Sequence, residues 1–84
     1  MPSYRKYKGK ANVIGEVIKE KREKLGLTKA DVCRKMELFG VSIDRTELYR
    51  IEEGQRSVKD FEIIVLFEVL QIDYNSEIKP LIIE

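Results

Sequence analysis

Hydrophobic residues recur at helical spacing along most of the chain, without the strict alternation that is typical of strands. In the first such segment, the positions at i, i+3, i+4, i+7 and i+11 are Ile14, Val17, Ile18, Lys21 and Leu25. These positions share one face of a helix. Gly26 follows, where a helix C-cap residue is expected. The pattern therefore predicts a helix over residues 13–25.

A capping pattern marks the start of a second helix. The hydroxyl of Thr28 can accept a hydrogen bond from the backbone N–H of Asp31, whose carboxylate can reach back to Thr28. The helix is predicted to run to Met36. The next residues, 37–43, break the helical period but carry four large apolar side chains: Leu38, Phe39, Val41 and Ile43. A solvated loop would not hold these side chains, so we expect the connection to pack back on the core.

Asp44 is predicted to cap a third, short helix over residues 45–53, which Gly54 ends. Leu48 and Ile51 are three positions apart and point inward. The side chains that point the other way are Arg45, Thr46, Tyr49 and Arg50.

An apolar run predicts a fourth helix, capped by Ser57 or Asp60 and ending near Leu70. Large apolar side chains cover more than half of its circumference: Phe61, Ile63, Ile64, Leu66, Phe67 and Leu70. We therefore expect this helix to be the central and most buried one. Asp73 is predicted to cap a last short helix over residues 74–79.

Five short helices with tight connections predict an all-α domain over residues 12–79. A basic N-terminal arm, residues 1–11, precedes it, and an apolar C-terminal tail, residues 80–84, follows it.

Charge is distributed unevenly, although the net charge is only +1. Residues 1–36 carry eleven Lys or Arg against four Asp or Glu, whereas residues 57–84 carry two against six. This segregation predicts a basic face, which favours phosphate as a partner. The alternative is that a small helical protein segregates charge by chance, and the low total is not typical of nucleic-acid binders.

The composition argues against several classes of function. The chain has no histidine and one cysteine, Cys33, so it lacks the commonest general base, a multi-cysteine metal site and an internal disulfide. Its longest apolar run is five residues, far short of the roughly 20 of a membrane span. The adjacent Glu52 and Glu53 would point about 100° apart on a helix and make no facing carboxylate pair. We expect no enzymatic activity, no cofactor and no membrane association.

The helix pair over residues 28–36 and 44–53 is typical of a helix-turn-helix, whose second helix presents its N-terminal side chains to base edges in the DNA major groove. Arginine can bond both O6 and N7 of guanine, and threonine offers a hydroxyl and a methyl group. Because many proteins that never touch DNA contain a similar pair, the neighbouring residues carry more information.

Four neighbouring features stand at informative spacings: Arg22, the turn Gly26-Leu27-Thr28, the sequence Ile51-Glu52-Glu53-Gly54, and Leu70. In these features the chain resembles the phage-repressor and Cro-type helix-turn-helix family, also called the XRE family. The resemblance covers roughly residues 13–78 and implies a five-helix, lambda-repressor-like DNA-binding domain.

The resemblance also implies roles for individual residues. The resemblance implies that four residues of the recognition helix, about residues 45–53, read bases: Arg45, Thr46, Tyr49 and Arg50. It also implies that five residues bind DNA phosphates: Thr28, Lys29, Gln55, Arg56 and Ser57. Arg22 and Glu52 match a family pair that forms an internal salt bridge between the first and third helices. Breaking a buried pair of this kind on one side costs about 3–5 kcal/mol.

Three features depart from the family or stay open. The connection between the second and third helices is longer than the family's usual tight turn and is similar to that of a long-turn subgroup. Phe67 stands where a small residue is usual, so the core must make room for it. Glu47, inside the recognition helix, could accept a hydrogen bond from a cytosine amine or repel a phosphate.

By this resemblance we expect a cytoplasmic transcriptional regulator of bacterial or phage origin, acting as a repressor. It would bind as a homodimer to a two-fold symmetric operator whose half-sites lie about one helical turn apart. Two alternatives share the fold: an antitoxin-like protein, and a protein-interaction module that has lost DNA binding. The apolar residues Leu81, Ile82 and Ile83 could serve a protein partner, pack against the first or fourth helix, or form a dimer contact.

The arm has two interpretations as well. Arg5, Lys6, Lys8 and Lys10 occur without an acidic neighbour, and we expect the segment to be poorly ordered in the free protein. These side chains could follow a phosphate strand or enter a minor groove, or they could form a solvated tail.

Overall fold

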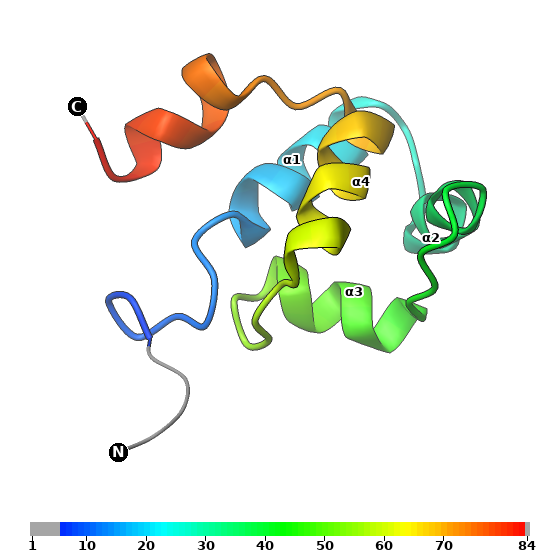
Figure 1. The fold of residues 1–84 in the computed structure, drawn as a ribbon, viewed down its shortest axis with the longest axis horizontal. Helices are drawn as coiled ribbons and strands as arrows, with labels where there is room; N and C mark the ends of the chain where they lie inside the picture. The colour runs from blue at the N-terminus through cyan, green and yellow to red at the C-terminus, as the bar shows by residue number, and fades with distance from the viewer. Residues whose placement is uncertain (1–5, 84) are drawn as a thin grey trace.

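The computed structural model describes residues 6–83. Its α-helices are α1 (Gly15–Lys24), α2 (Lys29–Glu37), α3 (Arg45–Glu52) and α4 (Asp60–Leu70) (Figure 1). A π-helical turn, η1 (Tyr74–Ile78), and a 3-10 turn, η2 (Lys79–Leu81), follow directly on each other and take the place of the predicted fifth helix. Within the described residues, the only extended pairing is an isolated bridge between Tyr7 and Lys10. The prediction of an all-α fold is confirmed.

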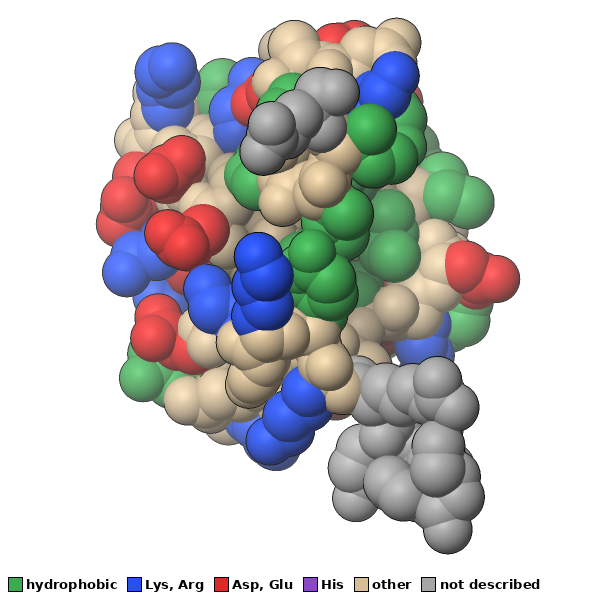
Figure 2. All heavy atoms as spheres, turned by 90° about the vertical axis from the view of Figure 1, so that its left-hand side faces the viewer, with side chains coloured by type: hydrophobic (Ala, Val, Ile, Leu, Met, Phe, Trp, Pro, Cys, Tyr) green, Lys and Arg blue, Asp and Glu red, His purple; other side chains and the backbone are tan. Residues whose placement is uncertain are grey.

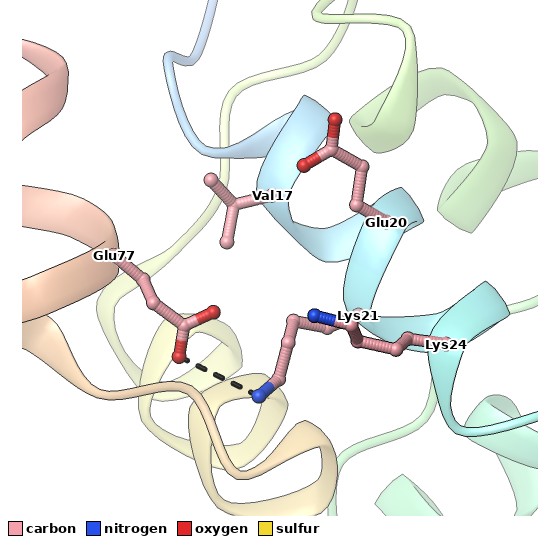
Figure 3. Close-up of a pocket in the computed structure, with 5 residues that line it drawn as sticks. All are labelled: Val17, Glu20, Lys21, Lys24 and Glu77. Atoms are coloured by element: carbon pink, nitrogen blue, oxygen red, sulfur yellow. Dashed lines mark ion pairs between the residues drawn. The ribbon is translucent and has the colours of Figure 1, made fainter.

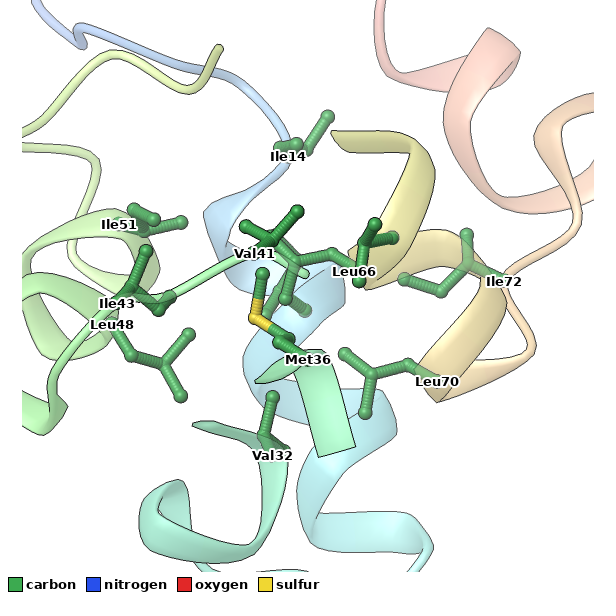
Figure 4. Packing of buried hydrophobic residues seen from close by; sticks show 12 residues of the cluster. Ile14, Val32, Met36, Val41, Ile43, Leu48, Ile51, Leu66, Leu70 and Ile72 are labelled. Carbon is green, nitrogen blue, oxygen red and sulfur yellow. The ribbon is translucent and has the colours of Figure 1, made fainter. Parts of the chain in front are cut away.

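The four α-helices enclose one small core. α1 and α2 each pack against both α3 and α4. The buried apolar side chains come from all four helices and from the segments between and after them (Figure 4): Ile14, Ile18, Val32, Met36, Val41, Ile43, Leu48, Ile51, Val65, Leu66, Leu70 and Ile72. In α3 the predicted inward residues, Leu48 and Ile51, are both fully buried. This anchoring leaves the opposite side of α3 free to face solvent.

The connection between α2 and α3 packs on the core only in its second half. Val41 and Ile43 are buried, as predicted, because alternate side chains of an extended segment point the same way. Leu38 and Phe39 were expected to pack inward as well, and this is wrong: Leu38 is 84% exposed and Phe39 57% exposed. They precede Gly40, whose φ of +81° turns the chain back toward the core only after them.

α4 is less central than its composition predicted. Val65, Leu66 and Leu70 are buried, but Phe61 is 50% exposed and Ile64 69% exposed. Ile63, Phe67 and Val69 are partly buried against the core, so the apolar residues of α4 that remain at the surface are Phe61 and Ile64. The predicted N-caps Ser57 and Asp60 are also wrong. The N-cap is Lys59, whose backbone N–H donates to Glu62 Oε1 at 3.0 Å.

The C-terminal segment lies against α1. Asp73 caps η1, as predicted, by accepting a hydrogen bond from the backbone N–H of Ser76 at 2.9 Å. Lys21 Nζ lies 3.5 Å from Glu77 Oε2 across a surface pocket between α1 and η1 (Figure 3). Three apolar residues of the tail are exposed: Leu81, Ile82 and Ile83. No helix among residues 6–83 has the length and apolar character needed to cross a membrane.

The described residues of the arm make backbone hydrogen bonds. Over residues 6–11 the chain makes a tight turn, in which Tyr7 and Lys10 exchange backbone hydrogen bonds of 2.8 and 3.0 Å. The backbone N–H of Ala11 then donates to the carbonyl oxygen of Gly54 at 2.8 Å. Residues 7–11 of the arm thus make backbone hydrogen bonds both with each other and with the loop after α3. Arg5 lies outside the described residues.

Candidate nucleic-acid interface

The N-terminus of α2 is fixed by the predicted capping box. The hydroxyl of Thr28 accepts a hydrogen bond from the backbone N–H of Asp31 at 3.0 Å, and Asp31 Oδ2 accepts one from the backbone N–H of Thr28 at 2.8 Å. Hydrogen bonding to Thr28 stabilises the charged carboxylate of Asp31 and so lowers its pKa below the ordinary value. Thr28 and Lys29 are therefore held at the exposed start of α2.

The start of α3 is fixed in the same way. Asp44 Oδ1 accepts from the backbone N–H of Glu47 at 2.7 Å, and Glu47 Oε1 accepts from the backbone N–H of Asp44 at 3.0 Å. Burial of Leu48 and Ile51 then sets the rotation of the helix. The predicted base-reading residues are all exposed on the other side: Arg45, Thr46, Tyr49 and Arg50.

The start of α2 and the exposed side of α3 form one continuous surface. Lys29 Nζ lies 5.9 Å from the centroid of the Tyr49 ring, within the range of a cation–π contact. Lys29 and Tyr49 line a shallow hollow together with Arg45 and Thr46. A neighbouring hollow is lined by Thr28, Lys29 and Arg45 among others. The packing of α2 on α3 thus brings two predicted phosphate contacts, Thr28 and Lys29, beside predicted base contacts, which here are Arg45, Thr46 and Tyr49.

A buried ion pair connects α1 to the end of α3. Arg22 Nε donates to Glu52 Oε2 at 2.7 Å, and Arg22 Nη2 donates to Glu52 Oε1 at 3.2 Å. Arg22 Nη1 also donates to the carbonyl oxygen of Leu27 at 2.9 Å. The hydrogen bonds that the Arg22 guanidinium donates to Glu52 raise its pKa, against the opposing effect of burial. One side chain therefore joins α1, the turn before α2 and the end of α3.

A family model described as helix-turn-helix matches residues 18–75, more than half of the chain. The chain belongs to this helix-turn-helix family. The prediction of an XRE-type protein is thereby confirmed, and with it a general role in DNA binding and transcriptional regulation. Comparison with curated proteins and with solved structures gave no significant match.

In this helix-turn-helix protein Arg56 makes contacts that sequence reasoning missed. Its guanidinium donates to both carboxylate oxygens of Glu62, at 3.0 and 3.1 Å, and lies 3.6 Å from Glu47 Oε2. The Arg56 side chain is only 19% exposed. The residue predicted to bind phosphate is thus paired with acidic residues of its own chain, whereas its neighbours Gln55 and Ser57 are exposed. The ion pair with Arg56 also involves Glu47, for which the sequence allowed two roles: a hydrogen bond from a cytosine amine or repulsion of a phosphate.

Asn12 and Gly15 position α3 and were also missed. Asn12 Oδ1 accepts from the backbone N–H groups of Ile14 and Gly15, at 3.0 and 2.8 Å. Asn12 Nδ2 donates to the carbonyl oxygens of Ile51 and Arg56, at 3.0 and 2.8 Å. The side chain of Asn12 therefore provides hydrogen-bond partners for backbone N–H groups at the start of α1 and for backbone carbonyl groups at and just after the end of α3. An asparagine just before a helix is a capping signal that could have identified the first half of this role.

Proposed function

We propose that this chain binds double-stranded DNA with α3 in the major groove and acts as a transcriptional repressor. The observation that carries the proposal is the shared surface of Lys29, Arg45, Thr46 and Tyr49, which joins the start of α2 to the exposed side of α3. In a helix-turn-helix, side chains near the start of the second helix reach base edges while the first helix crosses the backbone.

The residue roles follow from this docking. Arg45 and Arg50 are proposed to donate to guanine O6 and N7, and Thr46 and Tyr49 to contact neighbouring bases. The proposed phosphate contacts are Thr28, Lys29, Gln55 and Ser57, which are polar side chains at the two edges of the surface. For Arg56, the bonds to Glu62 favour a structural role over a phosphate contact.

A homodimer on a two-fold symmetric operator is part of the proposal. Figure 2 faces the side that lies on the left in Figure 1, and apolar side chains gather in the middle of this face. The exposed apolar residues near the C-terminus include Tyr74, Leu81, Ile82 and Ile83. Apolar surface of this kind in a small protein indicates an interaction site. A second copy would cover it and place two α3 helices on one operator.

The same apolar surface supports a second candidate function, an antitoxin-like protein that binds DNA and a partner protein. In the repressor, a second copy of this chain would cover the apolar tail. In the antitoxin-like protein, a different protein would cover it. A sedimentation measurement at micromolar concentration separates them, because a homodimer forms in the pure protein and a partner complex does not.

The experiment that tests DNA reading is a selection of bound duplexes from a randomised pool at near-physiological salt. The wild-type protein is compared with the double variant Arg45→Ala, Arg50→Ala, which changes exposed side chains only. We expect a two-fold symmetric motif that the double variant fails to enrich. Absence of enrichment from folded wild-type protein would overturn the proposal and favour a protein-interaction module.

A further inference from the structure

We propose that residues 6–10 of the arm contact DNA phosphates beside the C-terminal end of α3. This inference rests on the proposed function, because it adds a contact to the same DNA-binding surface. Three observations carry it: the place where the arm is attached, the shape of its turn, and the charges around it.

The arm is attached to the loop that follows the recognition helix. The backbone N–H of Ala11 donates to the carbonyl oxygen of Gly54, and Asn12 donates to the carbonyl oxygens of Ile51 and Arg56. The side chain of Lys10 packs over Gly54, where a Cβ would lie 3.3 Å from Lys10 Cδ. The arm and the end of α3 are thus bound to each other at several points, and Figure 1 shows them side by side.

The turn of the arm leaves its lysines exposed, with Lys8 Nζ 5.5 Å from the centroid of the Tyr7 ring. Lys8 and Gly9 both have positive φ, +50° and +84°, between the bonded pair Tyr7 and Lys10. Two consecutive residues with positive φ are typical of a type I′ turn, which reverses the chain within two residues. The side chains of Lys6, Lys8 and Lys10 are all exposed.

The charges at this end of α3 favour the arm as a cationic phosphate contact beside the uncharged Gln55 and Ser57. Arg56, the arginine of the loop, is paired with Glu62 and lies near Glu47. Lys10 lies 3.5 Å from Glu16 in an exposed pair. Within the described residues, Lys6 and Lys8 make no ion pair. A polyanion placed along α3 would meet these two ammonium groups without having to displace a carboxylate.

The position also suits the dimensions of the groove. The eight residues of α3 span about 12 Å, comparable to the width of the major groove, about 12 Å. Lys29 stands beside the first half of α3 and the arm beside its end. Lysines near both ends of α3 would give the proposed complex phosphate contacts that fix the position of the helix in the groove.

The test compares the double variant Lys6→Gln, Lys8→Gln with a control of equal charge loss, Lys24→Gln, Lys79→Gln, which changes exposed lysines of α1 and η2. Affinity for the selected operator and for an unrelated duplex is measured by fluorescence anisotropy at several salt concentrations. We expect the arm variant to bind both duplexes about tenfold more weakly, with a salt slope reduced by about 2. The control should keep the wild-type slope, and the thermal unfolding of both variants should match wild type.

An arm variant whose salt slope equals that of the control overturns the arm proposal while leaving the proposed function intact. A loss of affinity confined to duplexes with A·T-rich flanks would also overturn the arm proposal, because this result would place the arm in the minor groove. Failure of the wild-type protein to bind any duplex would refute the proposed function itself, and the arm proposal with it.

Discussion

The guanidinium of Arg56 forms two hydrogen bonds with the carboxylate of Glu62, at 3.0 and 3.1 Å, and so fixes the loop between the recognition helix and α4. Glu62 also accepts from the backbone N–H of Lys59 and thereby caps α4. Because Arg56 lies 3.6 Å from Glu47 as well, the pair reaches into α3 itself. The conformation of the proposed DNA-binding surface therefore depends on an ion pair within the protein itself.

The ion pair of Arg56 and Glu62 predicts how the free energy of unfolding changes at acidic pH. The hydrogen bonds from Arg56 lower the pKa of Glu62 below its ordinary value, with help from the backbone N–H of Lys59 and against desolvation. A carboxyl group whose pKa is lower in the folded state stabilises the fold above its unfolded pKa, about 4.3 for glutamate. That stabilisation is lost as the pH falls through the folded pKa. We expect Glu62→Gln to be destabilised at pH 7 and to lose less stability than wild type between pH 5 and pH 3.

Urea unfolding of wild type and of Glu62→Gln between pH 5 and pH 3 measures how steeply the free energy of unfolding falls with pH in each protein. Asp31 and Asp73 also have lowered pKa values and add to the acid sensitivity of both proteins equally, so only the difference between them reports on Glu62. Parallel stability curves for wild type and Glu62→Gln would contradict the assignment.

The buried pair of Arg22 and Glu52 predicts a large loss of stability when one partner is removed. The two side chains are only 9% and 1% exposed, so neither charge can be hydrated in the fold after its partner is gone. We expect Arg22→Ala to lower the free energy of unfolding by about 3–5 kcal/mol. The double variant Arg22→Met, Glu52→Leu should recover part of this loss, since it leaves no charge buried. Equal stability of the single and double variants in urea unfolding would argue against an essential buried charge pair.

Local signals predicted much of this fold. The caps at Thr28, Asp44 and Asp73 were found because each capping residue and its partner lie within three positions of each other. The inward positions of α3 followed from helical spacing, and the pairing of Arg22 with Glu52 was implied by the family resemblance.

Contacts between distant segments could not be predicted in this way. Asn12 bonds to carbonyl groups 39 and 44 positions away, and no local pattern reveals which loop will come near it. The exposure of Ile64 was missed for the same reason, because an apolar helix does not indicate which of its flanks the other helices cover. The pairing of Arg56 with Glu62 was likewise missed, because this acidic partner belongs to the next helix.

Close packing between α1 and α3 predicts that Gly15 tolerates no side chain. A Cβ at this position would lie 2.3 Å from the carbonyl oxygen of Ile51 and 2.8 Å from that of Glu52. These are backbone atoms at the end of the recognition helix, so relief requires the two helices to separate. We expect Gly15→Ala to cost about 1–3 kcal/mol, although alanine favours helices. Glu20→Ala, at an exposed position of α1, is the control and should stay close to wild type in thermal unfolding. A Gly15→Ala variant as stable as this control would contradict the contact.

The two proposed kinds of DNA contact predict different responses to single substitutions. Lys29 stands at the start of α2, so Lys29→Ala should weaken binding to every duplex alike and reduce the salt slope by about 1. Arg50 lies on the exposed side of α3, so Arg50→Ala should relax the preference at one base pair by about 1–3 kcal/mol. Anisotropy titrations of the selected operator and its single-base-pair variants at three salt concentrations measure both effects. Lys35→Gln, an exposed change at the other end of α2, controls for loss of charge. A base-specific effect of Lys29→Ala, or an unchanged preference in Arg50→Ala, would show that α3 does not read the groove in the proposed orientation.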